Sequence, residues 1–386
     1  MDILGRVAEL RAAGRDVISL CAGEPSGGAP TGVSDRAAAI HASRVPLTYT
    51  PTLGIAELRA AIAGHYRRWY GVEIPAANVA VTTGSSGAFM LTFLAAFNPG
   101  DRVALARPGY PAYRNILRVL GIEVVELDCG PETRYQPTPG QLDAAAAEHG
   151  PLSGLMLASP ANPTGTMLSR GELADLTAWC ARHAVRLISD EIYHGITYPA
   201  AGEPDPQGVC AWELDRTAVV ISSFSKYWGM TGWRLGWAIV PDDLLAAVDA
   251  LAGNVALCPP APAQMAAVEA FTEDSYRQAR GFVDEFASTR AVLLENLPRL
   301  GWGTAAPADG AFYLYADLGG AMAGFEDSAA YCAALLEEEG VALVPGADFD
   351  GVEGRRAVRL SFAAGREAVA EAVERIVRFQ AGNAHV

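Results

Sequence analysis

Short apolar segments alternate with longer helix-like segments over roughly residues 54 to 240 of the chain. The apolar segments are rich in Val, Ile and Leu, which is typical of strands that are buried on both faces. They are 78–83, 101–106, 122–127, 153–158, 185–190 and 218–223. Between several of these segments, apolar residues recur at the spacing of a helix, for example in 87–97, 113–121 and 172–184. The alternation predicts an α/β fold of three layers, with helices on both sides of a mainly parallel sheet.

After about residue 242 the alternation stops. A long helical segment of mixed charge comes first, then three short strand-like segments and a last helical one. These are 275–301, 311–318, 341–346, 356–362 and 366–380. This order predicts a second, smaller α+β domain, which the N-terminal residues join. We expect a large domain over residues 40–275 and a small domain built from residues 1–39 and 276–386.

Composition narrows the classes of protein that fit. The net charge is −15 and no run of basic residues occurs, so a nucleic-acid partner is not expected. The six cysteines show no metal-binding spacing, so we expect no metal site and no disulfide framework. No segment of about 18 apolar residues and no signal peptide is visible, so we expect no membrane partner. A cytoplasmic protein is the simplest interpretation.

The segment SSFSKYWGMTGWRLGW, residues 222–237, contains Lys226, the only lysine among 29 basic residues. Lysine forms Schiff bases with aldehydes, which arginine cannot do, because the guanidinium stays protonated. Codon bias that left one lysine by accident is the alternative. Ser223 and Arg234 flank Lys226 and suit a phosphate. The alternative is a strand end with ordinary caps and a surface arginine.

A second candidate phosphate site lies in TTGSSGAF, residues 82–89. A predicted strand ends there, Gly84 permits a tight turn, and Ser85 and Ser86 open a predicted helix. Free N–H groups at a helix start attract anions, and the two hydroxyls add hydrogen-bond donors. A serine that simply caps the helix is the plainer alternative.

Polar residues also follow three other predicted strands, and ligands of parallel sheets bind beyond the carboxyl ends of the strands. Asp190 ends one strand and needs a cationic or hydrogen-bonding partner there, while Tyr193 lies three residues further on. For the neighbouring His194 a partly exposed loop position is expected. Asn162 in a turn can bind a ligand oxygen, and the ring of Tyr110 can lie against a planar group.

Arg359 interrupts a predicted apolar strand of the small domain. A buried arginine needs an anion, and a carboxylate binds it through two parallel hydrogen bonds. That carboxylate could belong to a substrate or to a structural Asp or Glu of the protein.

Taken together, these residues resemble a known family. The chain looks like a fold-type I pyridoxal 5′-phosphate (PLP) enzyme of the class I/II aminotransferases, aspartate aminotransferase-like. The resemblance runs in order from RDVISLCAGEP (15–25) to AVRLSFA (357–363). Its most specific segment is 222–237, followed by ANPTG (161–165) and SDEIY (189–193).

The resemblance implies a role for each candidate residue. Lys226 would hold PLP as a Schiff base and act as the base in proton transfer. Asp190 would pair with the pyridine nitrogen, and Tyr193 and Asn162 would bind the phenolic oxygen. Tyr110 would stack on the ring. The remaining implied contacts are the phosphate with Ser85, Ser86, Ser223, Arg234 and the partner subunit's Tyr49, and the substrate carboxylate with Arg359 and the backbone near Gly23.

The activity that the resemblance implies is transfer of an amino group between an L-amino acid and a 2-oxo acid, with ping-pong kinetics, by a homodimer with shared sites. A PLP-dependent β-lyase on the same fold and a non-catalytic PLP-binding module are the alternatives. No Arg or Lys occurs between Arg234 and Arg277, which favours a neutral or hydrophobic amino donor. Ser26 stands where relatives often carry Asp, a departure that concerns substrate access.

Overall fold

A computed structural model of the chain describes residues 3–199 and 205–383. Its centre is a seven-stranded sheet with the strand order β2-β8-β7-β6-β5-β3-β4. The strands are β2 (Val79–Thr82), β3 (Arg102–Arg107), β4 (Glu123–Asp128), β5 (Gly154–Ala158), β6 (Arg186–Asp190), β7 (Val219–Ser223) and β8 (Gly236–Ile239). All six predicted strands of this region are present, and their pairings from β7 through β4 are parallel.

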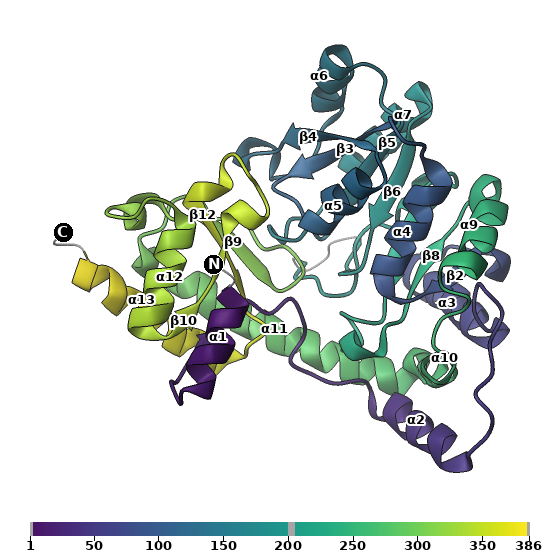
Figure 1. The fold of residues 1–386 in the computed structure, drawn as a ribbon, viewed down its shortest axis with the longest axis horizontal. Helices are drawn as coiled ribbons and strands as arrows, with labels where there is room; N and C mark the ends of the chain where they lie inside the picture. Colours follow the sequence, from purple (N-terminus) through teal and green to yellow (C-terminus); the bar gives the residue numbers. More distant parts are fainter. Residues whose placement is uncertain (1–2, 200–204, 384–386) are drawn as a thin grey trace.

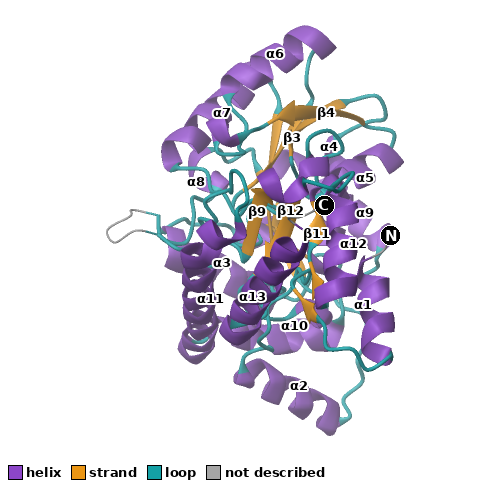
Figure 2. Cartoon of the chain, turned by 90° about the vertical axis from the view of Figure 1, so that its left-hand side faces the viewer, coloured by secondary structure: helices purple, strands orange, loops and turns teal. Residues whose placement is uncertain are grey.

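Both faces of this large sheet are buried, because successive residues of a strand point to opposite sides. Leu155 and Leu187 belong to one apolar cluster, and their neighbours Met156 and Ile188 belong to another. Helices cover both clusters: α3 (Ala56–Tyr70), α6 (Pro139–His149) and α7 (Arg170–His183) on one face, and α4 (Gly84–Ala96), α5 (Pro111–Val119) and α9 (Asp242–Val255) on the other. Figure 2 shows α6 and α7 on one side of β3 and β4, with α4, α5 and α9 on the opposite side. The expected three-layer α/β fold is confirmed.

Strand β8 differs from the expected pattern because it runs antiparallel to both of its neighbours, β2 and β7. Gly236 therefore lies between Thr82 of one strand and Ser223 of the other. A Cβ at Gly236 would lie 2.7 Å from the backbone of Gly84 and from the backbone nitrogen of Ser85. The backbone at the start of α4 thus packs directly onto β8.

A smaller set of elements lies beside the large sheet (Figure 1). Its three-stranded antiparallel sheet has the order β11-β12-β9. The elements of this small part are α1 (Ile3–Ala12), β1 (Ile18–Ser19), β9 (Tyr313–Asp317), β10 (Val341–Ala342), β11 (Val344–Pro345), β12 (Ala357–Ser361), α11 (Glu273–Leu300), α12 (Ser328–Glu339) and α13 (Arg366–Asn383). The N-terminal residues join it, since β1 pairs with β10 and Arg6 binds Glu337 of α12 at 2.6 Å.

Three further helices complete the described chain: α2 (Thr31–Ser43), α8 (Ala211–Leu214) and α10 (Ala261–Ala267). Helix α2 packs against α10 at the lower edge of the molecule (Figure 1). The division into a large domain of residues 40–275 and a small domain of residues 1–39 and 276–386 stays a proposal. Its first boundary falls within α2, and its second lies in the first turn of α11.

The close approach at Gly236 predicts a specific cost of adding one methyl group. Gly236→Ala should lower the free energy of unfolding by about 1–3 kcal/mol, because the new Cβ meets backbone atoms that cannot rotate away. Urea denaturation monitored by circular dichroism measures the change. Gly232→Ala is the matched control, since no atom lies within 4 Å of its added Cβ. Equal unfolding midpoints for the two variants would contradict the packing described here.

Candidate active site

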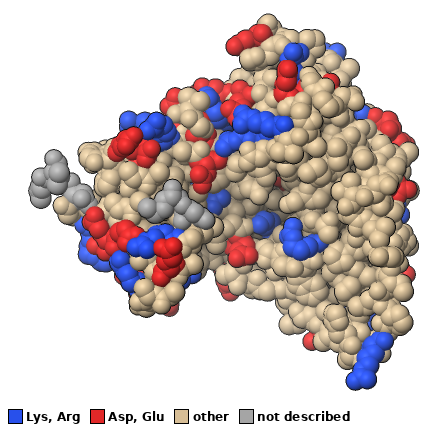
Figure 3. Space-filling model, viewed as in Figure 1, with Lys and Arg blue, Asp and Glu red and all other residues tan. Residues whose placement is uncertain are grey.

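A cavity of about 270 Å³ opens at the carboxyl ends of the parallel strands and is bordered by the small sheet. Figure 3 shows the hollow in this face of the molecule, with basic side chains inside it. Residues that are far apart in the sequence meet in its lining. The predicted site residues among them are Gly23, Ser85, Ser86, Tyr110, Asn162, Tyr193, Lys226, Arg234 and Arg359.

One end of the cavity is a cradle for an anion at the start of α4. Ser85 and Ser86 lie in the first turn of this helix, whose free N–H groups attract negative charge. The guanidinium of Arg234 lies against Gly84, in the space that a Cβ would occupy. Gly84 has φ +71° and Arg234 has φ 52°, so both hold left-handed backbone conformations at this turn. Ser225 lines the cavity as well, whereas the buried Ser223 hydroxyl behind it accepts the Ser225 N–H at 2.9 Å.

Asp190, the last residue of β6, is 3% exposed and lies behind the cavity. Its carboxylate accepts hydrogen bonds from the Tyr113 hydroxyl and from the backbone N–H of Ile192. Burial raises the pKa of Asp190 to about 7, against the opposing effects of these two donors and of the Lys226 charge. Asp190 makes no ion pair with a described side chain, so its charge is only partly compensated.

Lys226 lies three residues beyond β7, and its amine donates to the carbonyl of Gly23 at 2.5 Å. Burial lowers the pKa of Lys226 to about 8. Glu24 and Asp190 oppose this shift, and Arg234 and Arg359 add to it. The amine therefore holds a much larger uncharged fraction near neutral pH than an ordinary lysine does.

Arg359 projects from β12 into the other end of the cavity and is 6% exposed. Its Nη1 donates to Asn162 Oδ1 at 3.0 Å, and its Nη2 donates to the carbonyl of Cys21 at 2.8 Å. The guanidinium contacts two aromatic rings, with their centroids at 4.4 Å for Tyr313 and 4.9 Å for Phe349. Its buried Nε has no hydrogen-bond partner, and no described Asp or Glu forms an ion pair with it. The alternative that a structural Asp or Glu pairs with Arg359 is therefore not met in the described part of the chain.

Comparison with known proteins decides the family. The model of the family "Aminotransferase class I and II" matches residues 15–376. The chain is a class I/II aminotransferase. It is 50% identical to a valine–pyruvate aminotransferase from Mycobacterium tuberculosis, over 97% of this chain and 94% of the relative. It is 34% identical to an aspartate aminotransferase from Bacillus subtilis, over 98% and 95% of the two chains.

The fold agrees with this family. A crystal structure of an aminotransferase from Mycobacterium tuberculosis superposes with a TM-score of 0.93 and 49% identity, covering 99% of this chain and 96% of that one. The expected fold type I is confirmed. The protein moves an amino group between an amino acid and a 2-oxo acid, and its family uses PLP. Among the described residues, no helix is long and apolar enough to cross a membrane.

Several features of this aminotransferase were not expected from the sequence. His194 is buried, not partly exposed, because α3 lies over it and the Tyr70 hydroxyl lies 2.7 Å from its Nδ1. Tyr113 and Tyr313 reach the site although no motif marks them: Tyr113 binds Asp190, and the Tyr313 and Tyr193 hydroxyls lie 2.8 Å apart. Three-residue spacing after Tyr110, on one helical face, was the only signal for Tyr113.

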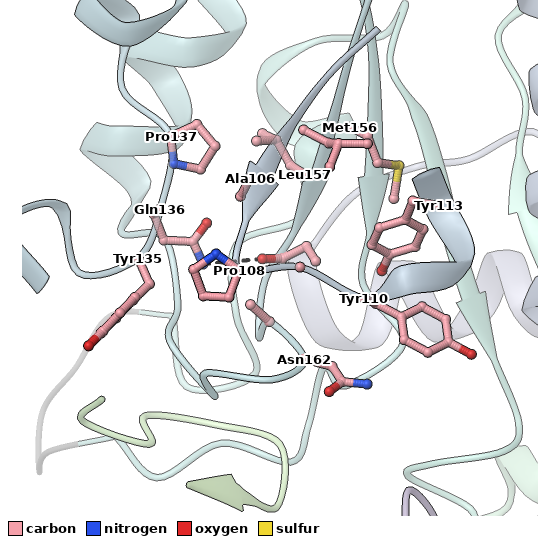
Figure 4. Close-up of a pocket in the computed structure, with 14 residues that line it drawn as sticks. Ala106, Pro108, Tyr110, Tyr113, Tyr135, Gln136, Pro137, Met156, Leu157 and Asn162 are labelled. Atoms are coloured by element: carbon pink, nitrogen blue, oxygen red, sulfur yellow. Dashed lines mark hydrogen bonds between the residues drawn. The ribbon is translucent and has the colours of Figure 1, made fainter. Parts of the chain in front are cut away.

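A second, narrow cavity lies behind the aminotransferase site and shares Tyr110, Tyr113 and Asn162 with it (Figure 4). Gln136 lies on the other side of this cavity and donates to the carbonyl of Ala158 at 3.2 Å. The volume of this second cavity, about 20 Å³, is enough for a single water molecule. The back wall of the active site is therefore closely packed.

The lowered pKa of Lys226 predicts an unusual chemical titration. Reductive methylation of the cofactor-free protein should modify Lys226 with a half-maximal rate near pH 8, since only the uncharged amine reacts. Peptide mapping by mass spectrometry separates this residue from the α-amine of the chain. In the urea-unfolded chain the midpoint should rise to about 10.4, the value of a free lysine. A folded-state midpoint at that higher pH would contradict the desolvation described above.

Proposed function

We propose that this chain is a PLP-dependent transaminase for neutral amino acids, with Lys226 as the lysine that binds the cofactor and transfers the proton. The observation that carries the proposal is the position of the only lysine. Its amine lies in one cavity with an anion cradle, a guanidinium that has no acidic partner among the described residues and, just behind the wall, a buried carboxylate. An accidental surface lysine would have none of these neighbours.

The residues present fit PLP by their unsatisfied chemistry. The cradle at Gly84, Ser85, Ser86 and Arg234 offers backbone N–H groups, hydroxyls and a cation, as a phosphate requires. Asp190 offers a desolvated carboxylate that a protonated ring nitrogen would neutralise. These two features lie at different places around the cavity, as the phosphate and the nitrogen of one ring do.

The remaining contacts follow from the same placement. We assign Tyr193 and Asn162 to the phenolic oxygen and Tyr110 to the ring face. The Ser223 hydroxyl accepts the Ser225 N–H and keeps its own proton for donation to the phosphate. Arg359, with its unpaired Nε, is assigned to the carboxylate of the substrate, and the backbone at Gly23 borders the same end of the cavity.

Bound PLP supplies an aldehyde that condenses with amines and a protonated ring that withdraws electrons from the substrate Cα. The protein's own residues do the rest. Arg359 fixes the substrate carboxylate, so that the Cα–H bond is held in one orientation, which lowers the entropic part of the barrier. The Lys226 amine removes the Cα proton, and its lowered pKa leaves enough uncharged base near neutral pH. Asp190 keeps the ring nitrogen protonated.

A second copy of the chain completes the site in this proposal. Tyr49 is 79% exposed, and the nearby Val45 and Leu47 are exposed too, although all three are large and apolar or aromatic. Thr52 links this segment to Asp249 of α9, whose end presents the exposed Val255. Burying such a surface favours self-association. The partner subunit's Tyr49 would then reach the phosphate, giving a homodimer with shared sites.

The charge of the cavity favours a donor with a neutral side chain. Its lining contains three cations, and the proposal assigns Lys226, Arg234 and Arg359 to the cofactor, the phosphate and the substrate carboxylate. No cation of the described lining is left for a second carboxylate. The half-identical relative named for valine and pyruvate supports the same class of donor. The cytoplasm is the proposed location, and all six cysteines are free thiols, as a reducing compartment requires.

Lys226→Ala tests the central residue. We expect kcat to fall by at least about 10²–10⁴-fold, the contribution of the proton transfer alone, with an unchanged far-ultraviolet circular dichroism spectrum. In the purified wild-type protein, borohydride should fix PLP covalently to Lys226, and peptide mapping identifies the labelled residue. Wild-type turnover in the alanine variant would contradict the proposal, and so would a label on another residue.

A panel of amino donors tests the substrate class. With pyruvate as acceptor, valine and other neutral donors should give a kcat/KM at least about tenfold above that of aspartate, because a second carboxylate would be desolvated without a cation. Product amino acids are measured by chromatography, with ammonia release assayed in parallel. A preference for aspartate would refute the neutral-donor proposal. A β-lyase would instead release ammonia and pyruvate from a donor with a leaving group on Cβ, which is assayed without added pyruvate.

A further inference from the structure

The segment that leads into helix α5 is bound to a turn of the small part, residues 346–350. Arg114 of α5 donates from Nη1 to the carbonyl of Phe349 at 3.1 Å and from Nη2 to the carbonyl of Asp348 at 2.8 Å. The backbone N–H of Gly109 donates to the same Phe349 carbonyl at 3.2 Å. Figure 1 shows α5 in front of the large sheet, on the same face as α4, with the small part to the left.

On its large-sheet side, this segment carries residues of the proposed cofactor site. Tyr110 is the N-cap residue of α5, and Tyr113 lies in the first turn and binds Asp190. Arg114 follows Tyr113 directly. One turn of helix therefore carries both the cofactor contacts and the contact with the small part, since Arg114 lies four residues after Tyr110.

On its small-part side, the turn supports Arg359. The centroid of the Phe349 ring lies 4.9 Å from the Arg359 guanidinium, which also lies 4.4 Å from the centroid of the Tyr313 ring. The turn is joined to β12, because β11 leads directly into it and pairs Val344 with Arg359. Gly346 also packs closely on the same strand, since an added Cβ there would lie 2.6 Å from the carbonyl of Ala357. Ala357 is the first residue of β12, the strand that carries Arg359.

Arg114 differs from the other arginines nearby in lacking an acidic partner among the described residues. Arg107, at the end of β3, pairs with Asp128 at 3.0 Å and with Asp350 of the turn at 3.5 Å. Arg118, one turn further along α5, pairs with Glu126 at 3.7 Å. The Arg114 guanidinium binds two backbone carbonyls of the small part instead. Hydrogen bonds from a charged donor are stronger than neutral ones, so this contact holds the turn firmly.

We propose that Arg114 is a positioning residue for the substrate carboxylate: it holds Phe349, and through Phe349 it holds Arg359 at the distance from the cofactor ring that the substrate requires. The proposal rests on the carboxylate role assigned to Arg359. Without the Arg114 contact the turn keeps, among the described residues, only the Gly109 hydrogen bond and the Arg107–Asp350 ion pair to the large-sheet side, so it is held less firmly. The separation between Arg359 and Tyr110 then widens, and carboxylate binding weakens without any change at the reacting atoms.

Arg114→Met, which keeps the length of the side chain but removes its donors, tests this role in the PLP-loaded enzyme. KM for the amino donor and for the 2-oxo acid should rise about tenfold, the loss expected when a binding group moves by a fraction of an ångström, while kcat stays close to wild type. The dissociation constant of 3-methylbutanoate, an unreactive carboxylate, should rise by the same factor in calorimetry. Arg114→Lys should give a smaller rise, and it carries the test if the methionine variant does not fold.

Arg118→Met is the matched control on the same helix, and it should leave all three constants unchanged. If Arg114→Met behaves like this control, or lowers only the melting temperature and the affinity for PLP, the positioning role is wrong. Arg359→Ala separates the two proposals. If it raises KM and the dissociation constant while Arg114→Met does not, only the role of Arg114 falls. If Arg359→Ala changes neither, the carboxylate site itself was misassigned.

A double-mutant cycle tests the route through Phe349. Phe349→Leu removes the ring beside Arg359 and should raise KM by itself. Combined with Arg114→Met, it should raise KM by less than the product of the two single effects, because both changes release the same contact. Fully multiplicative effects would show that the two residues act independently and would overturn the proposed route.

Discussion

Desolvation of charge is the constraint on which this site depends. Asp190 and Arg359 are both almost fully buried, and neither forms an ion pair with a described side chain. Hydrogen bonds from Tyr113, and to Asn162 and Cys21, compensate part of that cost. The uncompensated remainder is available to a ligand that brings a cation to one group and an anion to the other. Binding of such a ligand would therefore release part of the desolvation cost that the folded protein carries at these two residues.

The fold supplies this constraint through the direction of its strands. Strands β3, β5, β6 and β7 are consecutive parallel neighbours in the large sheet. The residues that follow their carboxyl ends therefore meet at one edge of the sheet. Arg359 of β12 and Tyr313 of β9 come from the small sheet. The position of Arg359 relative to the cofactor residues therefore depends on contacts between the two parts of the molecule, among them the turn at Phe349.

Much of this arrangement could be predicted from the sequence, because the informative residues sit directly after apolar strands. Lys226 was marked by being the only lysine, and Asp190 by ending a buried strand. Tyr313 could not be found in this way, because its contact with Tyr193 joins positions 120 residues apart and depends on how the two sheets pack. His194 was misjudged for a similar reason, since α3 buries it. The four-residue β8, rich in small residues, gave too short a pattern to reveal its reversed direction.

The reversed strand also sets an order of assembly. Strand β2 lies at the edge of the large sheet and pairs with β8 alone, although some 150 residues of sequence separate the two. During synthesis at about 5–20 residues per second, β2 and the serines that follow it leave the ribosome long before β8 does. The core from β3 to β7 can begin to fold in that interval, but the edge strand has no place until the polypeptide has grown past Ile239. The anion cradle at the start of α4, which follows β2, can therefore be completed only after β8 has been made, although its two serines are synthesised some 150 residues earlier.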